Sequence, residues 1–326
     1  MLYKQPRGFM FSKISLDING QKAEYREEIL TGIRCRISPS REERGLNALR
    51  IPETAAMKES CPFCPENIEK VTPCFENGTR IHVGESTTFP NIYPFGENHI
   101  VTVITEEHCP KEITERQICD SLKGQYLGLK EKNGFASINW NNLPSAGASM
   151  IHPHLQGLSD RMPTYLTSLY IEKSREYFER TGTNYWPSLI ESEKESDRYL
   201  FGDEVIWCAN PVPLGEKEIR GYLPFSSFDR LEDFIPVIAG GIRRVIGIYE
   251  KAGNHAFNLS IRFGKEENEK YFRAFVSMIA RIDPNPLSIS DSAFMERLHF
   301  EPVVMTLPET IKKRDKGYKT AVNPSD

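Results

Sequence analysis

The sequence predicts an α+β protein that contains two similar units in tandem. Stretches typical of strands and helices follow one another in the order strand, helix, strand, and this order occurs twice along the chain. The spacing also repeats, because the interval from Gly96 to Phe135 is 39 residues and the interval from Gly215 to Phe257 is 42 residues. A duplicated unit is therefore expected.

In the first unit the spacing of apolar residues changes from that of a strand to that of a helix and back again. Residues 100–105 are apolar and β-branched, which predicts a strand. Residues 111–130 carry apolar side chains at helical intervals, and Thr114 and Gln117 have the N-cap and N3 spacing of a capping box. Residues 134–140 alternate again, as in a strand. A helix between two strands is expected here.

The second unit repeats this order. Residues 219–225 predict a strand, residues 231–251 a helix that ends before Gly253, and residues 255–263 a second strand. Asp229 is expected to cap the helix, because its short acidic side chain can accept hydrogen bonds from the first turn.

A charged stretch at residues 191–197 separates the two units. We expect an N-terminal unit over residues 1–190, where a strand is possible at residues 9–18, and a C-terminal unit over residues 191–326. The first unit contains a His-Pro-His sequence, whereas residues 272–275 of the second unit read Phe-Arg-Ala-Phe. The chemistry is therefore expected in the first unit, with the second unit degenerate.

Composition places the chain among ordinary soluble globular proteins. Of its 326 residues, 39% are hydrophobic and 26% are charged, and the net charge is −4. No long basic run is present, so extended nucleic-acid binding is not expected. The apolar stretches are far shorter than the roughly 20 residues of a membrane span, and the N-terminus lacks an apolar segment of signal-peptide length. Seven cysteines without dense, even spacing indicate a reducing compartment, so we expect a cytoplasmic protein.

Cys61 and Cys64 form a CxxC pair. Two thiolates at this spacing match two corners of a tetrahedral zinc site. A redox pair is a second interpretation, but such pairs usually stand at the start of a helix, which the following Pro65 argues against. Two cysteines without any ligand are the third interpretation. The zinc interpretation is favoured, and it requires further ligands from elsewhere in the chain.

Seven histidines keep the search for these ligands short. His108 follows the strand expected at residues 100–105, and His152 opens the His-Pro-His sequence. For each of them the alternative is a surface position or a hydrogen-bonded core position, and this alternative is weaker for His152 because its neighbour is a candidate catalytic residue.

Residues 146–156, which read AGASMIHPHLQ, carry the strongest chemical signal. In an extended backbone alternate side chains share a face, so His152, His154 and Gln156 are expected to point the same way. A neutral imidazole at His154 can attack phosphorus and form a phosphoramidate, which divides a nucleotidyl transfer into two in-line steps. A metal-bound His152 would hold these three residues rigidly in place. The alternative interpretation of the segment is a solvated strand edge without a chemical role.

The same segment offers groups for binding phosphate. Gln156 and Ser149 can donate hydrogen bonds to nonbridging phosphate oxygens, and Gly147 lets the backbone approach them closely. Upstream, Phe89 and Asn91 could form a wall against a nucleoside base, although aromatic residues there are more often part of the core. At least one of the asparagines at 139, 141 and 142 is expected to reach phosphate, and Asn142 is the predicted one, although asparagines are common in turns.

These motifs, in this order and with a second half-repeat, resemble the galactose-1-phosphate uridylyltransferases of the histidine-triad (HIT) superfamily. The resemblance covers about residues 61–156, through CPFCPEN, a strand followed by EEH, and AGASMIHPHLQ, and it extends more loosely into the second repeat. It implies two tandem HIT-like units, each an antiparallel sheet with helices. It further implies a Zn²⁺ ion bound by Cys61, Cys64, His108 and His152.

The resemblance also implies an activity. It places a covalent nucleotidyl intermediate on His154, stabilised by Gln156, and glutamine at this place goes with transferases, whereas a third histidine goes with hydrolases. The expected reaction moves a nucleoside monophosphate from a nucleotide sugar to a sugar 1-phosphate, as in galactose metabolism. Many relatives are dimers, so a homodimer is expected. The partners expected are a nucleotide sugar and a sugar phosphate or phosphate, with no nucleic acid and no membrane.

Three departures from the family bear on the substrate. Leu155 replaces the glycine of the usual HPHGQ and is closer to the His-x-His-Leu-Gln of the phosphorylase branch. The second unit lacks the His-x-His that some uridylyltransferases use for a further metal. Residues 293–306, which by position would contact the hexose, lack the family's lysine, tyrosine, glutamate and glutamine pattern. Nucleotidyl chemistry is therefore better supported than galactose as the acceptor.

Two other functions compete with this expectation. A phosphorylase that splits ADP-sugars or diadenosine polyphosphates with inorganic phosphate is the alternative enzyme, and Leu155 favours it. A non-catalytic nucleotide-binding module is the alternative from another class, and it would bind nucleotide tightly without turnover.

Overall fold

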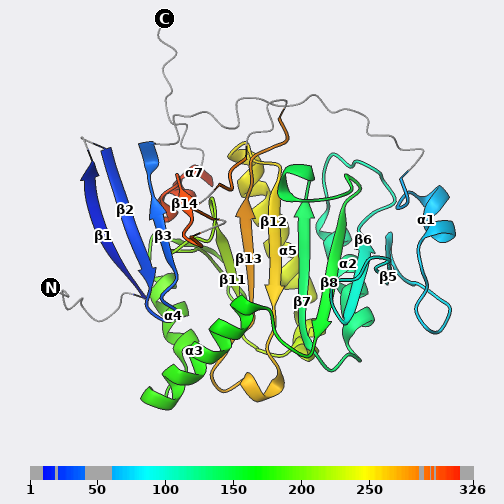
Figure 1. The fold of residues 1–326 in the computed structure, drawn as a ribbon, viewed down its shortest axis with the longest axis horizontal. Coiled ribbons are helices and arrows are strands. Elements are labelled where there is room, and N and C mark those ends of the chain that lie inside the picture. Colours follow the sequence, from blue (N-terminus) through cyan, green and yellow to red (C-terminus); the bar gives the residue numbers. More distant parts are fainter. Residues whose placement is uncertain are drawn as a thin grey trace, which may run out of the picture.

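The computed structural model describes residues 10–18, 21–40, 61–285, 290–293, 295–296 and 299–315. These residues form a ten-stranded sheet, a four-stranded sheet, and helices that cover both faces of the large sheet (Figure 1). Within these ranges no helix combines the length and the apolar character needed to cross a membrane.

The large sheet repeats one strand order on either side of its centre. The order is β4-β5-β6-β8-β7-β12-β13-β11-β10-β9, with antiparallel neighbours throughout. Read from the outer edge inward, the first five strands and the last five follow the same pattern, and they meet at the β7–β12 pair. The predicted tandem α+β units with antiparallel sheets are therefore confirmed. The strands are β4 (Ile81–Val83), β5 (Ser86–Pro90), β6 (Asn98–Val103), β7 (Phe135–Asn142), β8 (His154–Asp160), β9 (Tyr199–Phe201), β10 (Ile206–Ala209), β11 (Ile219–Tyr222), β12 (Phe257–Arg262) and β13 (Phe275–Ala280).

A long helix joins two strands in each unit, as the sequence predicts. In the first unit α2 (Glu115–Leu129) follows β6, and its capping box is present, because Thr114 Oγ1 accepts from the Gln117 amide at 3.2 Å while the Thr114 amide donates to Gln117 Oε1 at 2.9 Å. In the second unit α5 (Leu231–Lys251) follows β11. Asp229 does not cap α5, contrary to the prediction. A 3₁₀ turn at Phe228–Arg230 precedes the helix, and its cap is Ser227, whose Oγ accepts from the Asp229 amide at 3.3 Å.

Helices α2 and α5 pack side by side on one face of the large sheet (Figure 1). Every second strand residue points to them, and the resulting core runs through both units, for example from Leu155 to Trp140 and Leu259. Gly157 lets α2 approach β8, because a Cβ at this position would lie 2.0 Å from Gln125 Oε1. The two units therefore share one continuous core.

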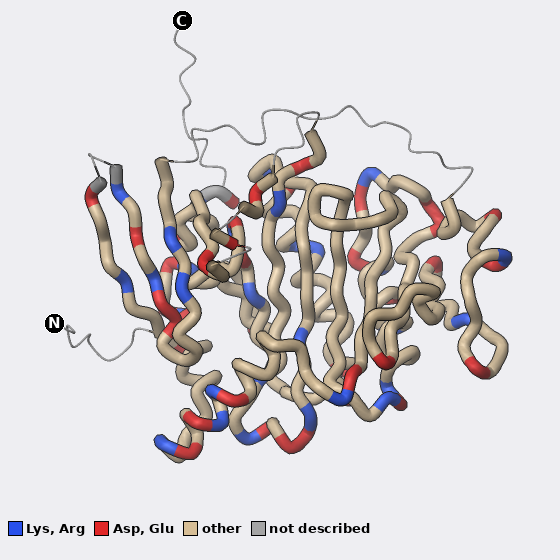
Figure 2. Tube along the Cα trace, viewed as in Figure 1, with Lys and Arg blue, Asp and Glu red and all other residues tan. Residues whose placement is uncertain are grey.

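The opposite face of the sheet is divided. Helices α3 (Tyr165–Thr181) and α4 (Tyr185–Lys194) cover β10, β11 and β13 through a second apolar cluster around the fully buried Trp186. Over β8, β7 and β12 the same face carries Gln156, Asn139 and Ser260, which are paired across the three strands. This part of the face is polar but largely uncharged, and in Figure 2 the central strands are tan while the charged residues gather at strand ends, loops and the small sheet.

The small sheet joins distant parts of the chain. Its order is β1-β2-β3-β14, and β14 pairs with β3 in parallel, so residues from both sides of the expected boundary at 190 share one sheet. The strand anticipated at residues 9–18 corresponds to β1. The strands are β1 (Phe11–Ile18), β2 (Gln21–Glu28), β3 (Arg34–Ile37) and β14 (Val303–Val304), and the remaining helices are α1 (Pro65–Val71) and α7 (Pro308–Asp315).

Candidate active site and metal centre

The CxxC pair lies on a turn that leads into a short helix. Cys64 is the N-cap of α1, with Pro65 in the first helical position, where its missing N–H costs nothing and its fixed φ fits the helix. The inference that Pro65 argues against a helix start is therefore wrong. The turn is closed by Asn67, whose side-chain amide donates to the Cys61 carbonyl at 2.9 Å. Both thiols are buried.

The structure brings the two thiols together with the two predicted histidines. One ligand atom from each of Cys61, Cys64, His108 and His152 lies within 4.8 Å of the others. His152 Nδ1 is 3.6 Å from Cys61 Sγ and 3.8 Å from Cys64 Sγ, and His108 Nδ1 is 3.4 Å from Cys64 Sγ. Zinc bonds of about 2.3 Å to sulfur and about 2.0 Å to nitrogen place tetrahedral donors about 3.6 Å apart. The donor set and its spacing therefore fit a tetrahedral metal ion.

The imidazole of His152 is oriented from its far side. Its Nε2 lies 2.8 Å from the carbonyl oxygen of Thr105, and because a carbonyl can only accept, Nε2 carries the proton and Nδ1 presents its lone pair to the thiols. Burial lowers the pKa of His152 to about 4, although the hydrogen bond to Thr105 opposes this shift, so the ring is neutral near pH 7. A neutral imidazole is the form that binds a metal.

His154 is held in the same way, two residues further along. Strand β8 begins at His154, and its Nδ1 donates to the His152 carbonyl at 2.9 Å, which leaves the lone pair on Nε2. Burial lowers the pKa of His154, which also favours the neutral ring. The ring packs edge-on against Phe63, with centroids 5.3 Å apart. The ring is therefore neutral, with its free lone pair on Nε2.

Alternation along β8 separates the residues that follow. Gln156 shares a sheet face with His154, whereas Leu155 faces α2 and is 3% exposed in the main core. Leu155 is the residue whose presence in the sequence favours the phosphorylase alternative. It packs in the core, on the opposite sheet face from His154. His152 lies just before the strand with its Nδ1 near the two cysteines, and Phe63 packs against the rings of both His152 and His154.

The turn before the histidines is held by both units. Gly147 has φ +92°, a conformation that glycine adopts without strain, and it ends a 3₁₀ turn at Pro144–Ala146. Asn258 of β12 donates from Nδ2 to Asn141 Oδ1 and to the Ala146 carbonyl, each at 2.7 Å. Ser149 is exposed two residues beyond Gly147. The second unit, expected to be degenerate, thus supports the predicted phosphate-binding segment of the first.

The remaining predicted binding residues fall into two groups. Phe89 is 2% exposed and packs with Phe63 at a centroid distance of 5.9 Å, on the sheet face that carries Gln156, and Asn91 directly follows β5. Asn142 lies on the opposite face of β7 from Asn141, and its side-chain amide donates to the His255 carbonyl at 2.8 Å. The structure therefore brings Asn141, rather than Asn142, to the face that holds Gln156.

Three residues join the site without having been predicted. Phe63 lies between the two cysteines in the sequence, and its ring packs against the rings of His152 and His154. His99 on β6 contacts Gln156, with 3.0 Å between Nε2 and Oε1, and Asn258 belongs to the other unit. Only Phe63 could have been recognised from the sequence, because it stands between two candidate metal ligands. His99 and Asn258 lie in strands whose local sequence does not distinguish them.

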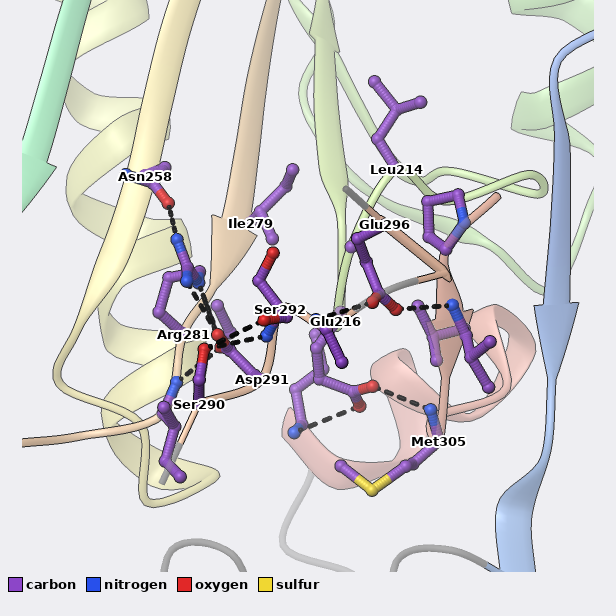
Figure 3. Close-up of a pocket in the computed structure, with 18 of the residues that line it drawn as sticks. Leu214, Glu216, Asn258, Ile279, Arg281, Ser290, Asp291, Ser292, Glu296 and Met305 are labelled. Carbon is purple, nitrogen blue, oxygen red and sulfur yellow. Dashed lines mark hydrogen bonds and ion pairs between the residues drawn. The ribbon is translucent and has the colours of Figure 1, made fainter. Parts of the chain in front are cut away.

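A cavity of about 480 Å³ opens at the ends of β11 and β13, at the end of the sheet where Asn258 lies (Figure 3). Arg281 joins its wall to the turn described above, since its Nη1 donates to Asn258 Oδ1 at 2.7 Å while Nε and Nη2 hold the Asp291 carboxylate. The segment expected to contact the hexose lines this cavity with Ala293, Met295, Glu296 and residues 302–305. Residues 294, 297 and 298 of that segment lie outside the described residues.

Comparisons with known proteins agree with this architecture. No family model matches the chain. An uncharacterized protein of Archaeoglobus fulgidus is 28% identical over 271 residues, which make up 80% of this chain and 82% of that protein. An ADP-glucose phosphorylase from Arabidopsis thaliana, solved with bound ADP-glucose, superposes with a TM-score of 0.70 at 17% identity, over 90% of this chain and 99% of that one.

Two further solved structures show the same likeness. A GALT-like protein from Arabidopsis thaliana has a TM-score of 0.69 at 17% identity, over 90% of this chain and 98% of that one. A uridylyltransferase has a TM-score of 0.65 at 17% identity, over 90% of this chain and 97% of that one. The chain therefore has the fold of these uridylyltransferase and ADP-glucose phosphorylase structures, which is the fold that the resemblance of its motifs implies.

Proposed function

We propose that the chain is a nucleotidyltransferase that works through a covalent intermediate on His154. The observation that carries the proposal is the bond from His154 Nδ1 to the His152 carbonyl, which leaves a lone pair on Nε2 of a neutral, buried ring. In the first step Nε2 forms a bond to the α-phosphorus of a nucleotide sugar, and the bond to the bridging oxygen breaks, so that the sugar phosphate leaves with the electron pair. In the second step an acceptor phosphate oxygen attacks phosphorus and the N–P bond breaks.

Neutral donors would stabilise the phosphoryl group during both steps. Gln156 lies on the face of His154, and the amide of Gln156, the hydroxyl of Ser149 and the backbone at Gly147 can donate to nonbridging oxygens. Phe89 in β5 and Asn91 directly after it would contact the nucleoside. The sheet face beside the nucleophile is polar but uncharged, so it would bind the phosphoryl oxygens through hydrogen bonds rather than ion pairs.

We further propose that Cys61, Cys64, His108 and His152 hold Zn²⁺. Because all four donors come from the protein, a bound zinc ion supplies a rigid anchor and no open coordination position. His152 would be held by the zinc ion, and its carbonyl accepts the hydrogen bond that orients His154. The metal would therefore fix the nucleophile through the backbone of His152. His152 itself acts only by position.

Two acceptors remain as candidate second substrates. A sugar 1-phosphate is the acceptor that the sequence motifs favour. Inorganic phosphate is the second candidate, because a solved structure similar to this chain is an ADP-glucose phosphorylase with bound ADP-glucose. Leu155 does not discriminate between them, since it packs in the core on the side away from His154.

The proposal is tested by trapping the intermediate. Purified protein is incubated, without acceptor, with UDP-glucose or ADP-glucose labelled at the α-phosphate, and a covalent adduct of about one label per chain is expected. The adduct is then chased with galactose 1-phosphate or with inorganic phosphate, and the faster release identifies the acceptor. Protein that remains unlabelled by both donors would show that the chain does not use this chemistry.

Asn258 should affect the reaction from the second unit. Its amide holds both Asn141 and the Ala146 carbonyl, so Asn258→Ala is expected to loosen the turn and slow adduct formation by about 10-fold, with a smaller effect on stability. Stopped-time labelling of the variant measures the rate. Asn133→Ala, a matched change at an exposed asparagine in the loop between α2 and β7, serves as the control and should label at the wild-type rate.

A further inference from the structure

His99 is a buried histidine of β6 that contacts the candidate site without being part of the metal cluster or the nucleophile. It is 4% exposed and lies on the sheet face that carries Gln156, because β6 pairs Val101 with Gln156 and His99 lies two residues from Val101. Its Nε2 is 3.0 Å from Gln156 Oε1. The ring is also held from the outside by Phe95, whose ring centroid is 4.3 Å away at an angle of 62°.

The contacts of the ring decide which nitrogen carries the proton. The Phe95 amide can only donate, and it points to His99 Nδ1 at 3.4 Å, so Nδ1 accepts and Nε2 carries the hydrogen. Nε2–H then donates to Gln156 Oε1. Burial lowers the pKa of His99, which keeps the ring neutral and leaves it only one N–H to give.

This tautomer determines the orientation of two amides. With Oε1 of Gln156 occupied by His99, the NH₂ end of Gln156 stays available as a donor. Asn91 has its Oδ1 taken by the Tyr93 amide at 2.9 Å, and its Nδ2 lies 3.1 Å from the same His99 nitrogen, where a protonated Nε2 offers no lone pair. The Asn91 amide hydrogens therefore also stay available to an acceptor on a ligand.

We propose that His99 is a positioning residue that fixes the Gln156 amide with its NH₂ toward the phosphoryl group on His154. The proposal rests on the proposed function, and it adds a group that acts only through Gln156. Without His99, the Gln156 amide can rotate by half a turn and present its oxygen to the phosphate oxygens, where it repels them. Preorganised donors lose their advantage when they must be reoriented during the reaction.

The test compares two replacements of His99 by their labelling kinetics. His99→Leu removes the donor, and it is expected to slow adduct formation at saturating nucleotide by about 10- to 100-fold while KM changes by less than about 3-fold. His99→Gln retains an N–H donor and is expected to recover most of the rate. His82→Leu, a matched change at an exposed histidine of β4, should leave the rate unchanged.

A double-mutant cycle separates positioning from a general structural role. In a Gln156→Leu background, His99→Leu should slow labelling by less than about 2-fold, because the group through which it acts is gone. An effect of full size in that background, or a raised KM with unchanged maximal rate, would overturn the proposal. Failure of the wild-type protein to form any adduct would instead refute the proposed function, so the two outcomes are distinguishable.

A second measurement does not depend on the folding of the leucine variant. In ¹⁵N-histidine-labelled protein, ring nitrogen shifts should show His99 as the neutral Nε2–H tautomer, with His99→Gln used for assignment. The Nδ1–H tautomer would contradict the proposed orientation of Gln156.

Discussion

Replacing His154 with alanine is expected to abolish the covalent adduct and to slow nucleotidyl transfer by at least about 10⁴-fold. The reason is that the nucleophile itself is removed, while the neighbouring donors stay in place. Labelling with an α-phosphate-labelled nucleotide sugar, followed by denaturing separation, measures the adduct, and exchange between sugar phosphate and nucleotide sugar measures the rate.

A control separates loss of the nucleophile from loss of the fold. His82→Ala changes an exposed histidine at the edge strand β4 and should label like the wild type. Both variants should keep the metal, since neither His154 nor His82 belongs to the four-residue cluster. An adduct of undiminished yield in His154→Ala would place the intermediate on another residue and would remove the basis of the mechanism.

Replacing Cys64 with serine is expected to abolish stoichiometric zinc binding. Cys64 Sγ lies next to both histidine ligands, at 3.4 and 3.8 Å, and a serine hydroxyl is a poor substitute for a thiolate. Changes to residues outside the ligand set already cost about 10- to 100-fold in metal affinity, so loss of a ligand should cost more. Elemental analysis of the purified proteins should find about one zinc per wild-type chain and far less than one per variant chain.

Thermal unfolding with and without a chelator extends this test to stability. An ion present at about 100 times its Kd stabilises the folded state by about 2.7 kcal/mol, so chelation should lower the Tm of the wild type. The Tm of Cys64→Ser should not respond, whereas Cys74→Ser, a change at an exposed cysteine, should respond like the wild type. A wild-type protein that lacks zinc and ignores the chelator would contradict the four-ligand assignment.

Elements that depend on neighbouring side chains were predictable from the sequence. The helix expected at residues 231–251 has these bounds in the structure, and the capping box of Thr114 and Gln117 forms as expected. Both depend on spacing within one or two turns, which a single sequence displays directly. The capping residue before α5 differs from the prediction, because Ser227, two residues before Asp229, accepts the free amide of the 3₁₀ turn that precedes the helix.

Residues whose importance depends on a neighbouring strand were not predictable in this way. His99 reaches Gln156 and Asn258 reaches Asn141 only because of the register of β6 with β8 and of β12 with β7. Asn142 is the residue that the sequence predicts to reach phosphate, whereas Asn141, on the other face of β7, lies beside Asn258. A shift of one residue in register would exchange these faces, and the sequence of one strand does not specify its partner.

The sequence by itself determined the chemical groups of the site and the order in which they occur. The CxxC pair, His108 and the row from His152 to Gln156 are recognisable because each is a local pattern of unusual residue types. Only the tertiary structure decided which of them meet and which way they face. Cys61 and His152 are 91 residues apart, and they come together because Ile68 of α1 and Phe63 pack against Phe89, Val101 and Val103 of the sheet. The main core on the other sheet face buries Leu155 and leaves His154 and Gln156 on the polar face, which is why substrate choice must be sought there.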